Sequence, residues 1–259
     1  MRVARFAGDD DPQFGVIGDD DGVATIAVLK GDPLYAGFDL TGQKVPLDDV
    51  RLLAPVIPRS KVVCVGKNYL KHAAEMGGEV PDEPLIFLKP NTSVIGPGEA
   101  ILYPEQSSEV HYEGELAVVI GRICRDVSAA DAAKVIFGYT VANDVTARDL
   151  QAKDGQWARA KGFDTFCPLG PWIETNLDPA DLGVTTVLGD DTKQDGRTSD
   201  MVFSVPDVIE YVSSFMTLLP GDVILTGTPD GVGPMAVGDT VSVTVEGIGT
   251  LTNRVIARD

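Results

Sequence analysis

Apolar residues along this chain recur mostly with the short period of β-strands. "QFGVIG" (13–18) and "GVATIAVL" (22–29) lie on either side of an acidic turn, and "KVVCVG" (61–66) is a brief, mainly apolar run. Near the C-terminus, "TVSVTVEG" (240–247) and "TLTNRVIA" (250–257) alternate apolar and polar positions. Such runs between turn residues predict strands, and the last two predict a hairpin.

Helical periodicity is confined to short segments. "SVPDVIEYVSSFMTL" (204–218) places its apolar residues on one helical face and is the clearest helix. Shorter helices are predicted at 68–76, where Asn68 can cap the first turn, and at 128–139. Because strands outnumber helices and no series of long βαβ units is visible, the pattern favours a strand-dominated α+β fold.

Composition narrows the range of partners. The 259 residues carry a formal net charge of −18, which argues against nucleic acid and anionic membrane surfaces as partners. No apolar run approaches the roughly 18 residues of a membrane span, and no signal-peptide pattern is visible at the N-terminus. The three cysteines, Cys64, Cys124 and Cys167, show no C-x-x-C spacing, so we expect a cytoplasmic protein without disulfides or zinc.

Two carboxylates stand where the chain is about to enter a core. In "VHYEGELAVVIG" (110–121), Glu113 and Glu115 precede five apolar residues. If 110–120 is one strand, both carboxylates lie on the same face, about 7 Å apart. Such a pair is often a solvated strand face, but two buried carboxylates would repel each other unless a cation compensates them.

A third carboxylate makes a cation site more plausible than a solvated strand face. Asp144 ends the apolar run in "VANDVTARDLQ" (141–151), and Arg148 and Gln151 lie three residues apart on the helical turn that follows. Asp144 alone could be a helix cap. Three carboxylates together are the ligand type that Mg²⁺ prefers, so the sequence raises the hypothesis of a metal site.

Five motifs resemble the fumarylacetoacetate hydrolase family and occur in that family's order across roughly residues 60–259. They are "GKNYLKHAAEM", "HYEGELAVVIG", "NDVTARDLQ", "RAKGFDTFCPLGPW" and "SVPDVIEYVSSFMTLLPGDVILTGTPDGVGP". The resemblance implies a β-roll catalytic domain at 59–259, preceded by a small β domain at 1–58. It also implies a homodimer.

The resemblance further implies a metal site for Mg²⁺ or Mn²⁺. Its ligands fall on Glu113, Glu115 and Asp144 in this sequence. Such a metal would hold a 2-oxo acid and act as a Lewis acid that stabilises its enolate.

Several groups around the metal match the family as well. Lys161, in "RAKGFD", matches a catalytic lysine that can stabilise the enolate, and Arg148 and Gln151 match positions that hold the substrate or order the site. Gly227 and Thr228, in "LTGTPDGVGP", match a substrate-binding loop in which a threonine hydroxyl or backbone N–H meets the substrate carboxylate.

The chain has two histidines, His72 and His111. His72 and Glu75 lie three residues apart and would share a helical face, where a carboxylate can orient an imidazole that activates water. In the acylpyruvase and oxaloacetate decarboxylase branch, this H-x-x-E pair belongs to a lid. The glycines that follow it could let the lid close. His111 is expected to pack beside the metal ligands.

These features favour a metal-dependent hydrolase or decarboxylase of a 2-oxo acid such as an acylpyruvate, fumarylpyruvate or oxaloacetate. Two alternatives remain open. One is isomerisation of 2-hydroxyhepta-2,4-diene-1,7-dioate or tautomerisation of oxaloacetate, and the other is a non-catalytic small-ligand or metal-binding protein with the same fold.

Overall fold

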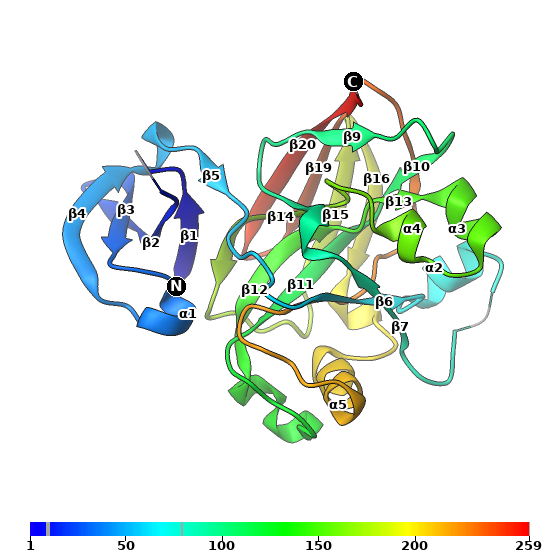
Figure 1. Cartoon of the computed structure of the whole chain (residues 1–259), viewed down its shortest axis with the longest axis horizontal. Coiled ribbons are helices and arrows are strands. Elements are labelled where there is room, and N and C mark those ends of the chain that lie inside the picture. Colours follow the sequence, from blue (N-terminus) through cyan, green and yellow to red (C-terminus); the bar gives the residue numbers. More distant parts are fainter. Residues whose placement is uncertain (9–10, 79, 259) are drawn as a thin grey trace.

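A computed structural model describes residues 1–8, 11–78 and 80–258. Strands dominate it, which confirms the predicted strand-rich α+β fold (Figure 1). The main sheet has the order β4-β3-β2-β1-β14-β12-β11-β17-β6-β7, with β5 paired to β1 and β8 to β14. Its strands are β1 (Arg2–Phe6), β2 (Gln13–Asp20), β3 (Val23–Leu29), β4 (Leu40–Pro46), β5 (Leu52–Leu53), β6 (Val62–Gly66), β7 (Leu85–Lys89), β8 (Val94–Ile95), β11 (Gly114–Ile120), β12 (Ile136–Asn143), β14 (Cys167–Glu174) and β17 (Val223–Leu225).

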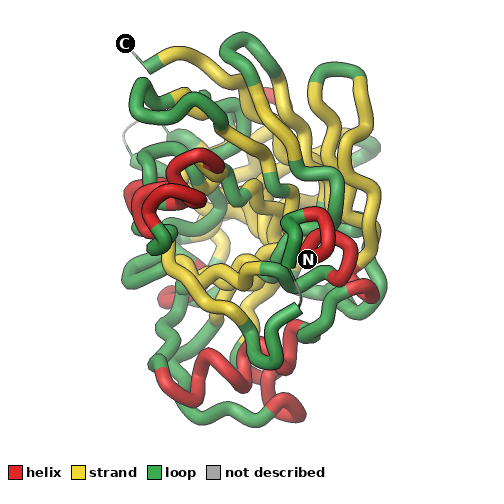
Figure 2. Tube along the Cα trace, turned by 90° about the vertical axis from the view of Figure 1, so that its right-hand side faces the viewer, coloured by secondary structure: helices red, strands yellow, loops and turns green. Residues whose placement is uncertain are grey.

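Two smaller sheets are formed by strands between residues 101 and 257, and strands, drawn in yellow, occupy much of the view in Figure 2. The five-stranded sheet runs in the order β16-β15-β19-β20-β9, and the three-stranded sheet in the order β13-β10-β18. Their strands are β9 (Ile101–Tyr103), β10 (Val110–Tyr112), β13 (Thr146–Ala147), β15 (Gly183–Leu188), β16 (Asp191–Arg197), β18 (Gly233–Met235), β19 (Thr240–Val245) and β20 (Gly249–Ala257). The predicted C-terminal hairpin is the antiparallel pair β19 and β20.

Helices are few and short. They are α1 (Pro33–Ala36), α2 (Leu70–Glu75), α3 (Arg148–Asp154), α4 (Ala158–Lys161) and α5 (Val205–Phe215), with 3₁₀ turns at η1 (Leu47–Asp49), η2 (Asn91–Ser93), η3 (Ala129–Lys134) and η4 (Thr198–Asp200). The segment predicted as a helix at 128–139 is the 3₁₀ turn η3, which runs directly into β12. Within the described residues, no helix is long and apolar enough to cross a membrane.

The strand β11 is buried on both faces. Leu116 and Val118 pack in a core with the five-stranded sheet and α5, while Ala117 and Val119 pack in a second core with β6, β14 and β17. A strand buried on both faces reads as a continuous apolar run, which explains the sequence pattern after Glu115. The carboxylates therefore lie at the N-terminal end of a strand in which every residue is buried.

The N-terminal strands form their own small cluster. Ala4, Phe6, Ile26 and Val28 pack together, and the N-terminal strands join the main sheet where β1 pairs with β14 (Figure 1). The division of the chain at residue 58 stays a prediction.

Candidate active site

The expected single strand at 110–120 is interrupted at Glu113. β10 and β11 belong to different sheets, and Glu113 is the residue between them. Its backbone is held by the end of β12, because the Glu113 N–H donates to Asn143 Oδ1 at 2.9 Å and its carbonyl accepts from the Asp144 N–H at 2.8 Å. The sheet switch thus places Glu113 directly beside Asp144.

Glu113, Glu115 and Asp144 form a compact group, here called the carboxylate trio. One oxygen from each lies within 4.8 Å of the others, and all three side chains are buried. The trio combines the two ends of neighbouring strands β11 and β12, which explains how residues thirty positions apart meet.

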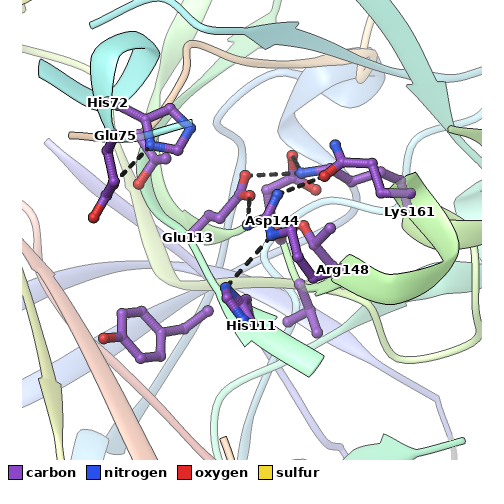
Figure 3. Close-up of polar contacts among 12 residues, drawn as sticks. His72, Glu75, His111, Glu113, Asp144, Arg148 and Lys161 are labelled. Carbon is purple, nitrogen blue, oxygen red and sulfur yellow. Dashed lines mark hydrogen bonds and ion pairs between the residues drawn. The ribbon is translucent and has the colours of Figure 1, made fainter. Parts of the chain in front are cut away.

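Three cations, here called the cation set, pair with carboxylates of this trio: Lys89, Arg148 and Lys161. Figure 3 shows Arg148 and Lys161 beside Glu113 and Asp144. Lys161 Nζ donates to Glu113 Oε2 and to Asp144 Oδ2, both at 2.8 Å. Arg148 Nη2 donates to Glu113 Oε1 at 2.5 Å, and Lys89 Nζ donates to Asp144 Oδ1 at 2.6 Å. Buried charges of this kind are tolerated only when each is paired and hydrogen-bonded.

The three cations pair with Glu113 and Asp144 but not with Glu115. Burial raises the pKa of Glu113, but Lys161 and Arg148 outweigh it and hold that pKa well below its ordinary value. Burial raises the pKa of Glu115 as well, and the neighbouring charges of Asp144 and Glu113 raise it further. Among the described residues Glu115 has no ion-pair partner, and its one polar contact is the Gly227 N–H, which donates to Glu115 Oε2 at 2.7 Å.

This donor set fits a hard divalent cation. Glu115 is a buried carboxylate without a cation, aimed at two further carboxylates, and Mg²⁺ or Mn²⁺ prefers oxygen ligands of this kind. Glu113, Glu115 and Asp144 would each supply one oxygen to the ion.

Arg148 orders the group from the side of α3. Its Nη1 donates to Gln151 Oε1 at 2.6 Å, so the two residues face one way as their spacing predicted. Arg148 Nε also contacts His111 Nδ1 at 3.4 Å, and His111 Nε2 meets Glu109 Oε1 at 2.8 Å. Burial and the charge of Arg148 lower the pKa of His111, which favours a neutral packing residue.

His72 and Glu75 approach the trio from α2. Figure 3 places His72 and Lys161 on either side of Glu113. His72 is buried, and its Nδ1 lies 3.3 Å from Glu75 Oε2. Glu75 has a second contact, because both of its oxygens accept from the Gly231 N–H at 3.1 and 3.2 Å. The pair therefore both orients the imidazole and docks α2 on the loop after β17.

The predicted cap of α2 is wrong. Tyr69, not Asn68, precedes the helix, and the Asn68 side chain instead donates to the carbonyls of Thr226 and Phe203 at 2.7 and 3.0 Å. Asn68 is fully buried, and a buried side-chain amide needs hydrogen-bond partners, which these two carbonyls supply.

The loop after β17 lies beside Glu115 and forms one side of the site. Gly227 has a φ of 99°, a backbone conformation that side chains rarely adopt, and a Cβ there would meet Asn68 Cβ at 2.7 Å. This conformation turns the Gly227 N–H onto Glu115. Thr228 follows and is buried, with its hydroxyl donating to the Gly114 carbonyl at 2.8 Å.

All the predicted site residues except Glu75 and Gly227 line one cavity of about 90 Å³. Apolar side chains that were not singled out from the sequence complete its wall, among them Phe87, Trp157 and Met76. Phe87 and Trp157 meet edge to face with ring centroids 5.2 Å apart. The cavity is thus lined by the charged groups of the trio and by apolar side chains, and Lys161 Nζ lies over the Phe87 ring, 5.0 Å from its centroid.

Lys89 is a further buried cation of the site that was not predicted from the sequence. The signal available was a lysine at the end of the apolar strand "LIFLK", because lysine is almost never fully buried unless it is paired. Lys89 is 1% exposed, and it donates to the Val145 carbonyl at 3.1 Å as well as to Asp144.

Comparison with known proteins places the chain in a family. The model of the fumarylacetoacetate (FAA) hydrolase C-terminal domain matches residues 61–256, and an Rv2993c-like N-terminal domain matches residues 1–55. The chain is 45% identical over 224 residues to the human mitochondrial oxaloacetate tautomerase FAHD2A, which covers 82% of this chain and 71% of the relative.

Solved structures agree with this match. A 5-carboxymethyl-2-hydroxymuconate delta-isomerase from Mycobacterium smegmatis is 54% identical with a TM-score of 0.92, and the match covers 100% of both chains. A maleylpyruvate hydrolase from Sphingobium sp. SYK-6, in complex with manganese (II) ion and pyruvate, is 32% identical with a TM-score of 0.82, again over 100% of both chains. The chain belongs to the fumarylacetoacetate hydrolase family.

Proposed function

We propose that this protein is a Mg²⁺- or Mn²⁺-dependent enzyme that acts on a 2-oxo acid through its enolate. The observation that carries the proposal is the buried carboxylate trio, in which Glu115 alone lacks a cation. When bound there, the ion would supply a Lewis acid that stabilises negative charge on the 2-oxo group. The manganese and pyruvate in the maleylpyruvate hydrolase structure support this assignment.

Lys161 is proposed to stabilise the charge that develops on the substrate. An ammonium group has three donors, and two of those on Lys161 are used by Glu113 and Asp144. The third can meet an enolate oxygen in the cavity that Lys161 lines. Arg148 donates to Glu113 from the other side and is itself held by Gln151, and both residues line the cavity.

His72 is proposed to act as the general base that accepts a proton during the reaction. Its imidazole lies at the cavity and is oriented by Glu75, the arrangement that a general base requires. In hydrolysis of an acylpyruvate or fumarylpyruvate, His72 would take a proton from water, the water oxygen would bond to the distal carbonyl carbon, and the C–C bond would break with its electron pair on the pyruvate unit. In decarboxylation of oxaloacetate, the same enolate forms as CO₂ leaves.

A second candidate is proton transfer without bond cleavage. The human relative is an oxaloacetate tautomerase, and the Mycobacterium smegmatis protein is a delta-isomerase. The same imidazole can pass a proton between carbon and oxygen of a bound 2-oxo acid. The small cavity, about 90 Å³ with α2 docked, favours a short substrate such as oxaloacetate over seven-carbon acids, both fumarylpyruvate and the diene-dioate.

A panel of substrates tests the proposal. Oxaloacetate, an acylpyruvate, fumarylpyruvate and 2-hydroxyhepta-2,4-diene-1,7-dioate are each incubated with the Mg²⁺- or Mn²⁺-loaded protein, and tautomerisation, CO₂ release and C–C cleavage are followed separately. We expect turnover of at least one, abolished in Glu115→Gln. Metal binding without turnover of any member would support the non-catalytic binding protein instead.

A further inference from the structure

Gln194 is a buried polar residue on an exposed edge strand. β16 faces solvent along most of its length, but Gln194 is 1% exposed and its side chain points into the protein, toward Gly114 and Thr228. Its side chain makes four hydrogen bonds. Gln194 Oε1 accepts from the Gly114 N–H at 2.9 Å and from Thr186 Oγ1 at 2.7 Å. Gln194 Nε2 donates to Thr228 Oγ1 and to the Pro229 carbonyl, both at 2.8 Å.

These four bonds join two parts of the candidate site. Gly114 lies between the two glutamates of the carboxylate trio, and a Cβ at Gly114 would meet Thr186 Oγ1 at 2.2 Å. The glutamine amide therefore fits against bare backbone on the side of β11. On its other side it holds the loop that carries Thr228. One side chain thus links the backbone between Glu113 and Glu115 to this loop, in addition to the direct bonds from Gly227 and Thr228 to β11.

The strand β16 is shaped to this loop beyond Gln194. A Cβ at Gly196 would meet Pro229 Cβ at 2.5 Å, and a Cβ at Gly231 would meet the Lys193 carbonyl at 2.1 Å. Gly231 has a φ of 92°. Neither glycine has space for a side chain, so the loop and β16 pack closely, with Gln194 as a polar link between them.

The network decides which group of Thr228 is available to a ligand. A hydroxyl has one hydrogen, and that of Thr228 is donated to the Gly114 carbonyl while its oxygen accepts from Gln194. The Thr228 backbone N–H, by contrast, has no hydrogen-bond partner among residues 1–8, 11–78 and 80–258. A carboxylate needs donors, so only the N–H can serve it.

We propose that Gln194 is a positioning residue that holds the Thr228 loop against β11, so that Thr228 meets the carboxylate of the substrate with its backbone N–H while its hydroxyl stays structural. This inference rests on the proposed function, because it assumes that a 2-oxo acid binds in the cavity that Thr228 lines.

Two substitutions separate the two sides of the link. Gln194→Met keeps the volume and removes all four bonds. Gln194→Glu keeps acceptors for Gly114 and Thr186 but loses at least one of the two donors that reach the loop. The matched control is Asn253→Asp, since Asn253 is 2% exposed and its Nδ2 likewise donates to two carbonyls, those of Gly96 and Glu99, away from the cavity.

The first measurement is hydrogen–deuterium exchange in the metal-free protein, read by mass spectrometry on peptides covering 226–232 and 112–120. We expect faster exchange at 226–232 in Gln194→Glu and faster still in Gln194→Met, with 112–120 unchanged in Gln194→Glu. Unchanged protection at 226–232 in both variants would overturn the inference. This measurement requires neither metal nor turnover, so it remains decisive if the proposed function fails.

The second measurement is calorimetric binding of Mn²⁺, followed by binding of oxalate to the Mn²⁺-loaded protein. In Gln194→Glu we expect Mn²⁺ affinity within about threefold of wild type. We expect oxalate affinity to fall by roughly 10-fold or more, the usual effect of removing a hydrogen-bond partner that supports a ligand-binding group. Asn253→Asp should change neither. Equal losses of Mn²⁺ and oxalate affinity would overturn the inference, because Gln194 would then support the whole site. Wild-type protein that binds no Mn²⁺ would instead count against the proposed function.

Discussion

Lys89 Nζ lies 2.6 Å from Asp144 Oδ1, and the exposed fraction of each residue is 1%. Such a pair can hold a metal ligand in place before the metal arrives. It also makes the metal-free protein depend on the lysine, because removal of one partner leaves the other charge buried and less compensated.

We therefore expect Lys89→Met to lower the free energy of unfolding by about 3 kcal/mol in the absence of metal. Saturating Mn²⁺ should recover more of this free energy in the variant than it adds to wild type, since the ion compensates Asp144. Urea unfolding with and without Mn²⁺ measures both quantities. Lys61→Met is the matched control, because Lys61 forms a 2.6 Å pair with the buried Asp222 away from the cavity. An equal Mn²⁺ increment in the two variants would contradict the role assigned to Lys89.

The carboxylate trio gives a second prediction. Glu115→Gln keeps the shape of the side chain and an acceptor for the Gly227 N–H but removes the charge. We expect Mn²⁺ affinity to fall by more than the roughly 10–100-fold typical of groups outside the ligand shell. Titration calorimetry checks this against Glu174→Gln, another buried glutamate that pairs with the N-terminal amine instead. Retained affinity in Glu115→Gln would remove Glu115 from the ligand set.

His72 and the metal should have separable effects. If His72 activates water, His72→Ala should lower kcat/KM for an acylpyruvate by roughly 10²–10⁴-fold. Decarboxylation of oxaloacetate needs no attacking water and should lose less. Both constants are compared with those of Lys71→Ala, an exposed neighbour on the same helix. Equal losses on the two substrates would make His72 a positioning or gating residue.

The two contacts of Glu75 can be tested apart. Glu75→Gln keeps an oxygen for the Gly231 N–H but no longer presents a charge to His72, whereas Glu75→Ala loses both contacts. We expect the first to lower kcat with little change in hydrogen exchange of α2, and the second to lower kcat and speed that exchange. Faster exchange in Glu75→Gln as well would show that the charge of Glu75, rather than its oxygen, docks the helix.

Local sequence patterns predicted much of the candidate site. The apolar run after Glu115 and the three-residue spacing of Arg148 and Gln151 follow from burial and helical period, so both are visible in one sequence. The order of five motifs identified the family. Catalytic roles of the individual residues stay predictions.

What the sequence could not supply depends on contacts between distant segments. The break between β10 and β11 at Glu113 arises because two sheets diverge there, while the apolar pattern continues across it. Asparagine is common at helix N-caps, yet the Asn68 side chain donates to two carbonyls more than 130 residues away in the sequence. Lys89 and Gln194 have no local signal beyond being polar in a strand, and their partners come from other strands and loops.

The pairing of the trio with the cation set also bears on substrate choice. Without metal, the formal charges of these two groups cancel, and a divalent ion leaves an excess of two positive charges in a buried space. Poorly screened charge of that size costs free energy until anions balance it. A 2-oxo acid with two carboxylates restores neutrality, whereas one with a single carboxylate leaves a positive charge uncompensated. Under the proposed function we therefore expect these charges to favour 2-oxo acids with two carboxylates, and we expect a reaction that removes one negative charge from the bound molecule to weaken the binding of its own product.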